Sequence, residues 1–216
     1  MPSTDPVETR TARVGDLDIA YETFGDPNDP TVLLVMGLST QMVAWPDELC
    51  EGLANAGHHV VRFDNRDIGL STHVATPAPS LPAMLARRGT PYTISDMAGD
   101  AVGLLDALDV ERAHVVGVSM GGFISQTIAV EHPSRVATLS LLMTSTGSRR
   151  VGRPSVAVMR SFLDRKPVTT LEEAMDGAVA TYRLIGSPDL DEEMIRETAA
   201  LSFERGHDPA GPQRQL

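Results

Sequence analysis

Four short apolar runs, separated by stretches of helical periodicity, constrain the fold more than any other feature of the sequence. They lie at 31–36 (TVLLVM), 58–63, 112–118 and 136–143. Most of their residues are apolar on both faces, as in a strand whose sheet is covered by helices on both sides. The alternation of strand and helix therefore predicts an α/β fold with a mostly parallel, doubly wound sheet.

Other segments complete this pattern. Residues 17–23 alternate in polarity, which predicts a half-exposed antiparallel strand at an N-terminal edge, after a short strand near 12–14. Helices are predicted at 43–55, 93–108 and 120–131, where apolar residues recur at helical spacing. After Thr144 the alternation stops, and the remaining periodic stretches, at 155–163, 171–185 and 191–204, are all helical.

Composition narrows the classes of function. The chain of 216 residues carries 18 Lys and Arg against 29 Asp and Glu, a formal net charge of -11. Such a surface repels phosphate backbones and anionic lipid, so we expect no nucleic-acid or membrane partner. The first residues lack the basic and apolar regions of a signal peptide. The single cysteine, Cys50, permits no intrachain disulfide, and a cytoplasmic location is expected. Composition leaves the oligomeric state open.

The segment Gly117-Val118-Ser119-Met120-Gly121 carries the strongest chemical signal, because it fits G-x-S-x-G between a buried strand and a helix. In such a turn the serine hydroxyl projects above the sheet, and the glycines admit closely passing backbone. The helix start offers the Met120 amide to an oxyanion. Ser119 is therefore predicted to be a nucleophile. The alternatives are an incidental serine in a turn, and a dinucleotide fingerprint, which would need glycine at position 119.

Two further motifs extend this pattern to a known family. RFDNRDIGLST resembles the D-x-R-G-x-G-x-S loop of the α/β-hydrolase superfamily, with Asp67 in place of the usual glycine. LLVMGLSTQMVAW stands where that family has its oxyanion loop. With the Ser119 turn, these motifs make the chain resemble the α/β-hydrolases, and among them the aclacinomycin methylesterase type of bacterial ester hydrolase. Arg66 and Asp67 are expected to pair within their loop or with backbone.

The resemblance implies a division of the chain and a set of site residues. Residues 1–147 would form the hydrolase core and 148–216 a helical cap. The Leu38 amide would be the second oxyanion donor, with the Gly37 amide as an alternative. Independently of the resemblance, methionines gather at the edge of the sheet that carries Ser119, which predicts an apolar cavity there. The predicted substrate pocket includes Met36, Gly37, Trp45 and Met143, and it would accept an ester of a small-to-medium, largely apolar molecule. No metal or cofactor is expected.

No histidine stands where the general base is required. In this family the acid and the histidine follow the serine along the chain, whereas His132 would lie about 18 Å from Ser119 along its helix. His73 lies at the correct edge of the sheet but precedes the serine. The simplest expectation is an incomplete chain, with the last strands, the acid and the histidine encoded in about 60 further residues. Residues 1–216 alone are then expected to be a poor catalyst.

The nucleophile motif does not select one reaction. Amide or lactone hydrolysis, acyl transfer and cofactor-free peroxidation are alternatives on the same fold. A non-catalytic protein that binds an apolar ligand under the cap is the alternative outside enzymes. A catalytic histidine in the full-length gene would favour the enzyme.

Overall fold

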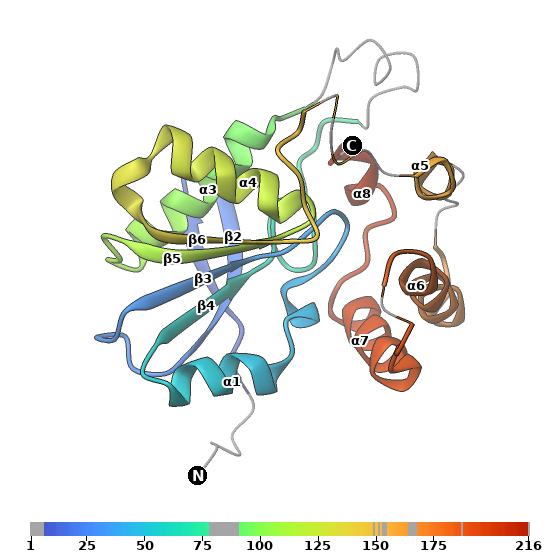
Figure 1. Cartoon of the computed structure of the whole chain (residues 1–216), viewed down its shortest axis with the longest axis horizontal. Helices are drawn as coiled ribbons and strands as arrows, with labels where there is room; N and C mark the ends of the chain where they lie inside the picture. Colours follow the sequence, from blue (N-terminus) through green and yellow to red (C-terminus); the bar gives the residue numbers. More distant parts are fainter. Residues whose placement is uncertain are drawn as a thin grey trace.

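A six-stranded sheet, in the order β1-β2-β4-β3-β5-β6, forms the centre of the molecule (Figure 1). The computed structural model describes residues 7–77, 91–148, 150, 152, 155–163, 168–186 and 188–215. β1 and β2 form an antiparallel edge, and β4, β3, β5 and β6 run parallel to one another. The mostly parallel sheet with an antiparallel N-terminal edge is therefore confirmed. The strand bounds are Arg10–Val14, Leu17–Phe24, Thr31–Val35, His59–Phe63, Ala113–Val118 and Val136–Leu142.

Helices cover both faces of the sheet, which confirms the doubly wound arrangement. α3 (Ile94–Ala107) and α4 (Met120–Glu131) lie on one face and α1 (Asp47–Asn55) on the other (Figure 1). Each face buries its own apolar cluster: Leu33, Val61 and Phe63 are fully buried on the α3 and α4 side, while Leu34 and Val60 pack towards α1. This double burial explains why β3 is apolar on both faces, whereas β6, at the edge of the sheet, is largely exposed.

The helix predicted at 43–55 begins later than expected. Met42–Ala44 form a 3₁₀ turn, η1, and α1 starts only at Asp47. Pro46 between them has φ -59° and ψ 144°, and its ring and missing N–H are tolerated before a helix but not inside one. The chain therefore bends at Pro46.

The half-exposed character predicted for β2 is wrong. Its interior, Ile19–Glu22, is buried, and Glu22 is only 4% exposed. β2 pairs with β4, and Arg62 of β4 supplies a buried guanidinium whose Nη2 lies 2.5 Å from Glu22 Oε2. From the sequence, Glu22 is expected on the solvent-facing side of the strand. In the structure it is buried and forms an ion pair with Arg62.

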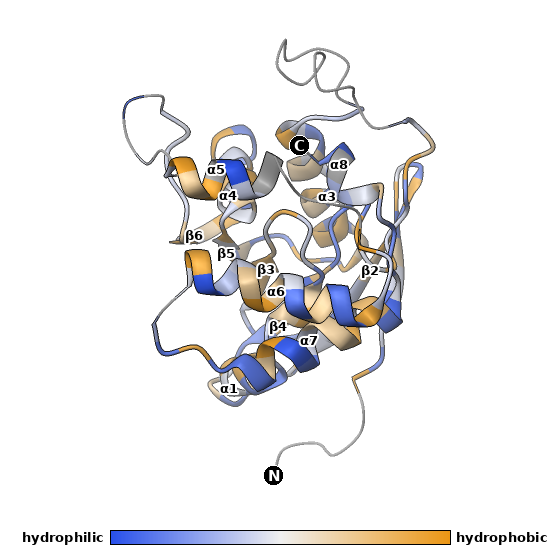
Figure 2. Ribbon diagram, turned by 90° about the vertical axis from the view of Figure 1, so that its right-hand side faces the viewer, coloured by the Kyte–Doolittle hydropathy of each residue, from blue (hydrophilic) through white to orange (hydrophobic). Residues whose placement is uncertain are grey.

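After β6, the regular elements that the structure describes are all helices, joined by irregular segments. α5 (Val156–Leu163), α6 (Leu171–Ile185), α7 (Glu192–Arg205) and the short α8 (Gly211–Arg214) lie beside the sheet (Figure 1). α6 and α7 lie side by side, and each carries hydrophilic and hydrophobic residues (Figure 2). The boundary between a core of 1–147 and a cap of 148–216 stays a prediction. No described helix combines the length and apolar character needed to cross a bilayer.

Candidate active site

Ser119 occupies a strained turn between β5 and α4. Its φ of 55° and ψ of -117° place it outside the regions that residues with a side chain normally adopt. The neighbouring elements hold it there: its amide donates to the Leu142 carbonyl at 2.9 Å, and its carbonyl accepts from the Gly122 amide at 3.0 Å. The Ser119 residue is exposed although the strand before it is largely covered.

Close backbone contacts explain the glycines around this turn. A Cβ on Gly117 would lie 2.4 Å from the Gly121 carbonyl oxygen, and one on Gly121 would lie 2.2 Å from that of Val35. A Cβ on Gly37 would lie 3.2 Å from Ser119 Cβ, so the loop after β3 passes directly against the serine. The close approach that the sequence predicts for Gly117 and Gly121 is present.

Ser119 opens into a pocket of about 430 Å³. As the first residue of α4, Met120 has an amide with no carbonyl partner within its own helix. Leu38 and Met120, the two predicted oxyanion donors, line the pocket together with Ser119. The remaining lining residues are Tyr92, Thr93, Ile94, Met97, Phe123, Arg214 and Gln215. The pocket is therefore mostly apolar, with polar groups at Ser119 and at the C-terminal segment.

The other predicted pocket residues lie in different environments. Gly37 packs against Ser119. Met36 and Trp45 are each 6% exposed and belong to the apolar cluster on the α1 side of the sheet. Met143 follows β6 and is 64% exposed. Sequence reasoning missed Phe123, although it lies one turn after Ser119 on α4 and that spacing could have indicated it.

Residues of the loop after β4 hold the predicted oxyanion loop, residues 33–45, by buried hydrogen bonds. Asp64 is fully buried; its Oδ1 accepts from the Met42 amide at 2.7 Å, and its Oδ2 lies 3.2 Å from Arg205 Nη1. Burial raises the pKa of Asp64 despite these partners. Asn65 Nδ2 donates to the Met36 carbonyl at 3.0 Å. Buried hydrogen bonds from Asp64 and Asn65 thus hold the chain on both sides of Gly37.

Arg66 and Asp67 contact more distant partners than expected. Arg66 Nε lies 2.5 Å from Asp100 Oδ2 on α3. Asp67 Oδ1 accepts from the Val74 amide at 2.9 Å, which fits the expected backbone contact, but it also accepts from Arg214 Nε at 2.8 Å. The expectation of pairing within the loop is therefore wrong for the charged partners, which come from α3 and α8.

All six histidines lie in the described part of the chain, and none of them lines the Ser119 pocket. His73 resembles part of a triad, because its Nδ1 lies 3.1 Å from Asp208 Oδ2. Its Nε2, however, lies 3.1 Å from the Gly69 carbonyl oxygen and not at a serine. His114 contacts Thr138 at the start of β5. The described residues thus place the predicted nucleophile and the predicted backbone donors in one pocket whose described lining contains no histidine.

The cluster of Asp67, His73 and Asp208 has metal-ligand spacing, with one ligand atom of each within 4.8 Å of the others. A cation already lies between its carboxylates: Arg214 contacts Asp67 at 2.8 Å and Asp208 at 2.6 Å. A guanidinium therefore balances this charge, and the geometry does not favour a metal ion.

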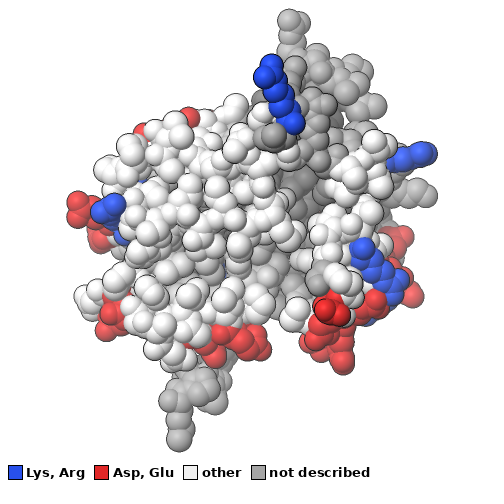
Figure 3. All heavy atoms as spheres, in the orientation of Figure 1, with Lys and Arg blue, Asp and Glu red and all other residues white. Residues whose placement is uncertain are grey.

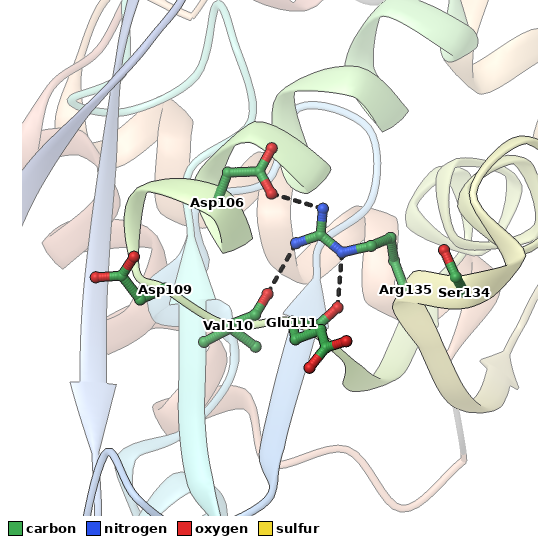
Figure 4. Close-up of a pocket in the computed structure, with 6 residues that line it drawn as sticks. All are labelled: Asp106, Asp109, Val110, Glu111, Ser134 and Arg135. Atoms are coloured by element: carbon green, nitrogen blue, oxygen red, sulfur yellow. Dashed lines mark hydrogen bonds and ion pairs between the residues drawn. The ribbon is translucent and has the colours of Figure 1, made fainter.

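A second pocket, of about 420 Å³, lies at the opposite end of β5. Arg135 crosses it and donates to Asp106 Oδ1 at 2.6 Å, to the Val110 carbonyl at 2.8 Å and to the Glu111 carbonyl at 2.7 Å (Figure 4). All the guanidinium contacts drawn there are internal. Arg135 thus fastens the loop between α3 and β5, and this pocket is a structural depression away from Ser119.

Ser119 lies in a strained strand-to-helix turn at the edge of a mostly parallel, doubly wound sheet. This arrangement is typical of the class of hydrolases whose nucleophile occupies such a turn. Residues 30–181 match the alpha/beta hydrolase fold family, and the chain belongs to this family.

Individual relatives are consistent with this assignment. Rhodomycin D methylesterase DauP from Streptomyces sp. (strain C5) is 34% identical over 214 residues, which cover 89% of this chain and 68% of that protein. 3-Oxoadipate enol-lactonase 2 from Acinetobacter baylyi is 29% identical and covers 94% of this chain and 69% of its own. The crystal structure of the enol-lactonase from Burkholderia xenovorans LB400 superposes with a TM-score of 0.64 at 24% identity, covering 95% of this chain and 71% of that chain.

Proposed function

We propose that the protein is a serine hydrolase that cleaves carboxylic esters of small-to-medium, largely apolar molecules. The observation that carries the proposal is the strained Ser119, exposed in a pocket that it shares with Leu38 and Met120. Ser119 Oγ attacks the ester carbonyl carbon while a general base takes its proton, and the carbonyl oxygen becomes an oxyanion. The intermediate collapses with loss of the alcohol, which takes up that proton, and water then cleaves the acyl-serine to release the acid and restore the hydroxyl. The amides of Met120 and Leu38 bind that oxyanion, with the Gly37 amide as the alternative second donor.

The pocket lining supports an apolar substrate. Ile94, Met97 and Phe123 contribute apolar side chains to its lining. A relative named as a methylesterase favours ester hydrolysis, and one named as an enol-lactonase keeps lactone hydrolysis as the alternative.

The proposal assigns the protein no nucleic-acid or membrane partner, no cofactor and a cytoplasmic location. The net charge of -11 supports the absence of a nucleic-acid partner and of a membrane partner. On the face in Figure 3, acidic side chains gather along the lower edge and basic side chains are few. Such a surface favours a small neutral substrate over a polyanion.

A general base completes the proposed mechanism, since a serine hydroxyl is protonated and weakly nucleophilic near neutral pH. We expect a histidine and an acid from outside residues 1–216 to fill these roles. His73 with Asp208 is the alternative inside the chain, and it would require the imidazole to leave the Gly69 carbonyl.

Active-site labelling of the product of the complete reading frame tests the proposal. A fluorophosphonate is expected to label Ser119, and Ser119→Ala is expected to abolish the label. Ser95→Ala is the matched control, because Ser95 is an exposed serine on α3 that contacts Glu131. An unlabelled wild-type protein that binds apolar ligands would favour the non-catalytic alternative, and undiminished labelling of Ser119→Ala would refute the nucleophile.

A further inference from the structure

Gln215 lines the Ser119 pocket and connects two loops through its side chain. Its Oε1 accepts a hydrogen bond of 2.9 Å from the Ser39 amide, and its Nε2 donates one of 3.0 Å to the Arg66 carbonyl. The side chain itself lines the pocket beside Leu38 and Ser119. One amide group therefore joins the loop after β3 to the loop after β4.

The bond to Ser39 fixes the peptide next to the predicted oxyanion donor. Ser39 has φ 60°, a left-handed conformation that is strained for a residue with a side chain. Such a conformation persists only where surrounding contacts hold it. The Leu38 carbonyl, on the same peptide unit as the Ser39 amide, accepts from Thr40 Oγ1 at 3.0 Å. The orientation of Leu38 thus depends on contacts on both sides of this peptide.

Gln215 is presented by an anchored helix end. The preceding residue, Arg214, is 7% exposed and donates through Nε to Asp67 at 2.8 Å and through Nη2 to Asp208 at 2.6 Å. Charge-assisted contacts of this kind are stronger than neutral hydrogen bonds. The position of Gln215 is therefore set by the buried Asp67 on the loop after β4 and by Asp208 after α7.

We propose that Gln215 is a positioning residue for the oxyanion loop. Its side-chain amide holds the Ser39 N–H, and this contact aims the Leu38 amide at the oxyanion that forms on the substrate of Ser119. The inference rests on the proposed function, and it adds a residue that acts through Ser39 and takes no part in proton transfer.

Two substitutions separate hydrogen bonding from packing. Gln215→Ala removes the bridge and leaves space, whereas Gln215→Met fills nearly the same volume without either hydrogen bond. Removing one oxyanion donor outright lowers kcat about 100-fold to 1,000-fold. Because Gln215 acts on the donor indirectly, we expect both variants to lower kcat for a short-chain ester about 10-fold to 100-fold, with KM within about threefold.

Arg135→Ala is the matched control for stability. It removes three hydrogen bonds at the opposite end of β5, so it is expected to lower the urea midpoint and leave kcat unchanged. The experiment uses the product of the complete reading frame, with kcat, KM and the rate of fluorophosphonate labelling measured for each variant.

The outcomes separate this inference from the function on which it rests. If Ser119 is labelled in the wild type and Gln215→Met reacts at the wild-type rate, the hydrogen bonds do not position the loop and the inference is overturned. A large rise in KM at constant kcat would also overturn it, because that pattern indicates substrate binding. A wild-type protein that is not labelled at Ser119 would overturn the proposed function and this inference together.

Discussion

Arg62 Nη2 lies 2.5 Å from Glu22 Oε2 in the interior of the protein, and the two side chains are 3% and 5% exposed. The pair connects β4 to β2, at the junction where the parallel sheet meets its antiparallel edge. Arg62 also contacts Asp47 of α1 at 2.6 Å and the Trp45 carbonyl. One guanidinium therefore ties the sheet to the helix below it.

Arg62→Met is expected to destabilise the fold strongly. Removal of one partner leaves the Glu22 carboxylate buried without its main cation, a change that costs about 3–5 kcal/mol. Urea unfolding followed by circular dichroism measures the free energy of unfolding. Glu192→Ala is the control, because it breaks the exposed pair with Arg183 and should cost less than about 1 kcal/mol. Equal losses in both variants would show that the buried pair has no special role.

Gly121→Ala is expected to disrupt the Ser119 turn, whereas Gly99→Ala is expected to be tolerated. The new Cβ at Gly121 would lie 2.2 Å from the Val35 carbonyl oxygen, while a Cβ at the exposed Gly99 of α3 would meet nothing within 4 Å. Alanine in a helix is favoured over glycine by about 1 kcal/mol. The thermal midpoint and the labelling of Ser119 should therefore fall for Gly121→Ala, and the midpoint should rise for Gly99→Ala. A stable, fully labelled Gly121→Ala protein would contradict this account of the turn.

Cys50 is expected to be unreactive in the folded protein. The thiol is fully buried, and burial raises its pKa from 9.0 to about 11. Only the thiolate reacts with alkylating agents, and each pKa unit changes its fraction tenfold, so alkylation at pH 8 should be at least about 100-fold slower than in unfolded chain. Iodoacetamide labelling with and without urea, read by mass spectrometry, measures the ratio. Similar rates in both conditions would mean that the thiol is accessible.

Residues 1–216, studied alone, are expected to self-associate through β6. This strand is the last in the sheet order, and Leu139, Leu141 and Leu142 along it are 36–45% exposed. An exposed apolar edge strand offers unpaired backbone groups to another chain. Leu141→Lys should therefore shift sedimentation profiles towards the monomer. Val156→Lys, at an 85% exposed position on α5, is the control; an equal shift there would point to general solubility in place of edge pairing.

The parallel strands were predictable because their signal is local. Residues 31–36 are apolar except for Thr31, and the strand they form, β3, is buried along its whole length. Residues 136–143 carry a similar apolar pattern, although β6 lies exposed at the edge of the sheet. The Ser119 turn was predictable for the same reason, since the glycines at 117 and 121 meet backbone from adjacent elements. The start of α1 was misplaced although Pro46, which sets it, is visible in the sequence.

The remaining features depend on partners that are far away in the sequence. The sequence around Glu22 predicts an exposed side chain, because its buried partner Arg62 lies 40 residues later in the chain. Arg214 and Gln215 belong to a polar tail whose composition indicates neither a helix nor a pocket wall. Their contacts with Asp67 and Ser39 span 147 and 176 residues. A local sequence pattern does not indicate contacts between residues so far apart. This part of the candidate site could therefore be identified only from the three-dimensional structure.

The bond between Ser39 and Gln215 also sets an order of events during synthesis. The strands around Ser119 come from the first 142 residues, and they can begin to pair while later residues are still being added. The loop at Ser39 cannot receive its partner until residue 215 has left the ribosome. A contact of high sequence separation also carries a larger loop-closure entropy than a local one. The Ser119 turn can therefore form before the loop at Ser39 gains its contact with Gln215.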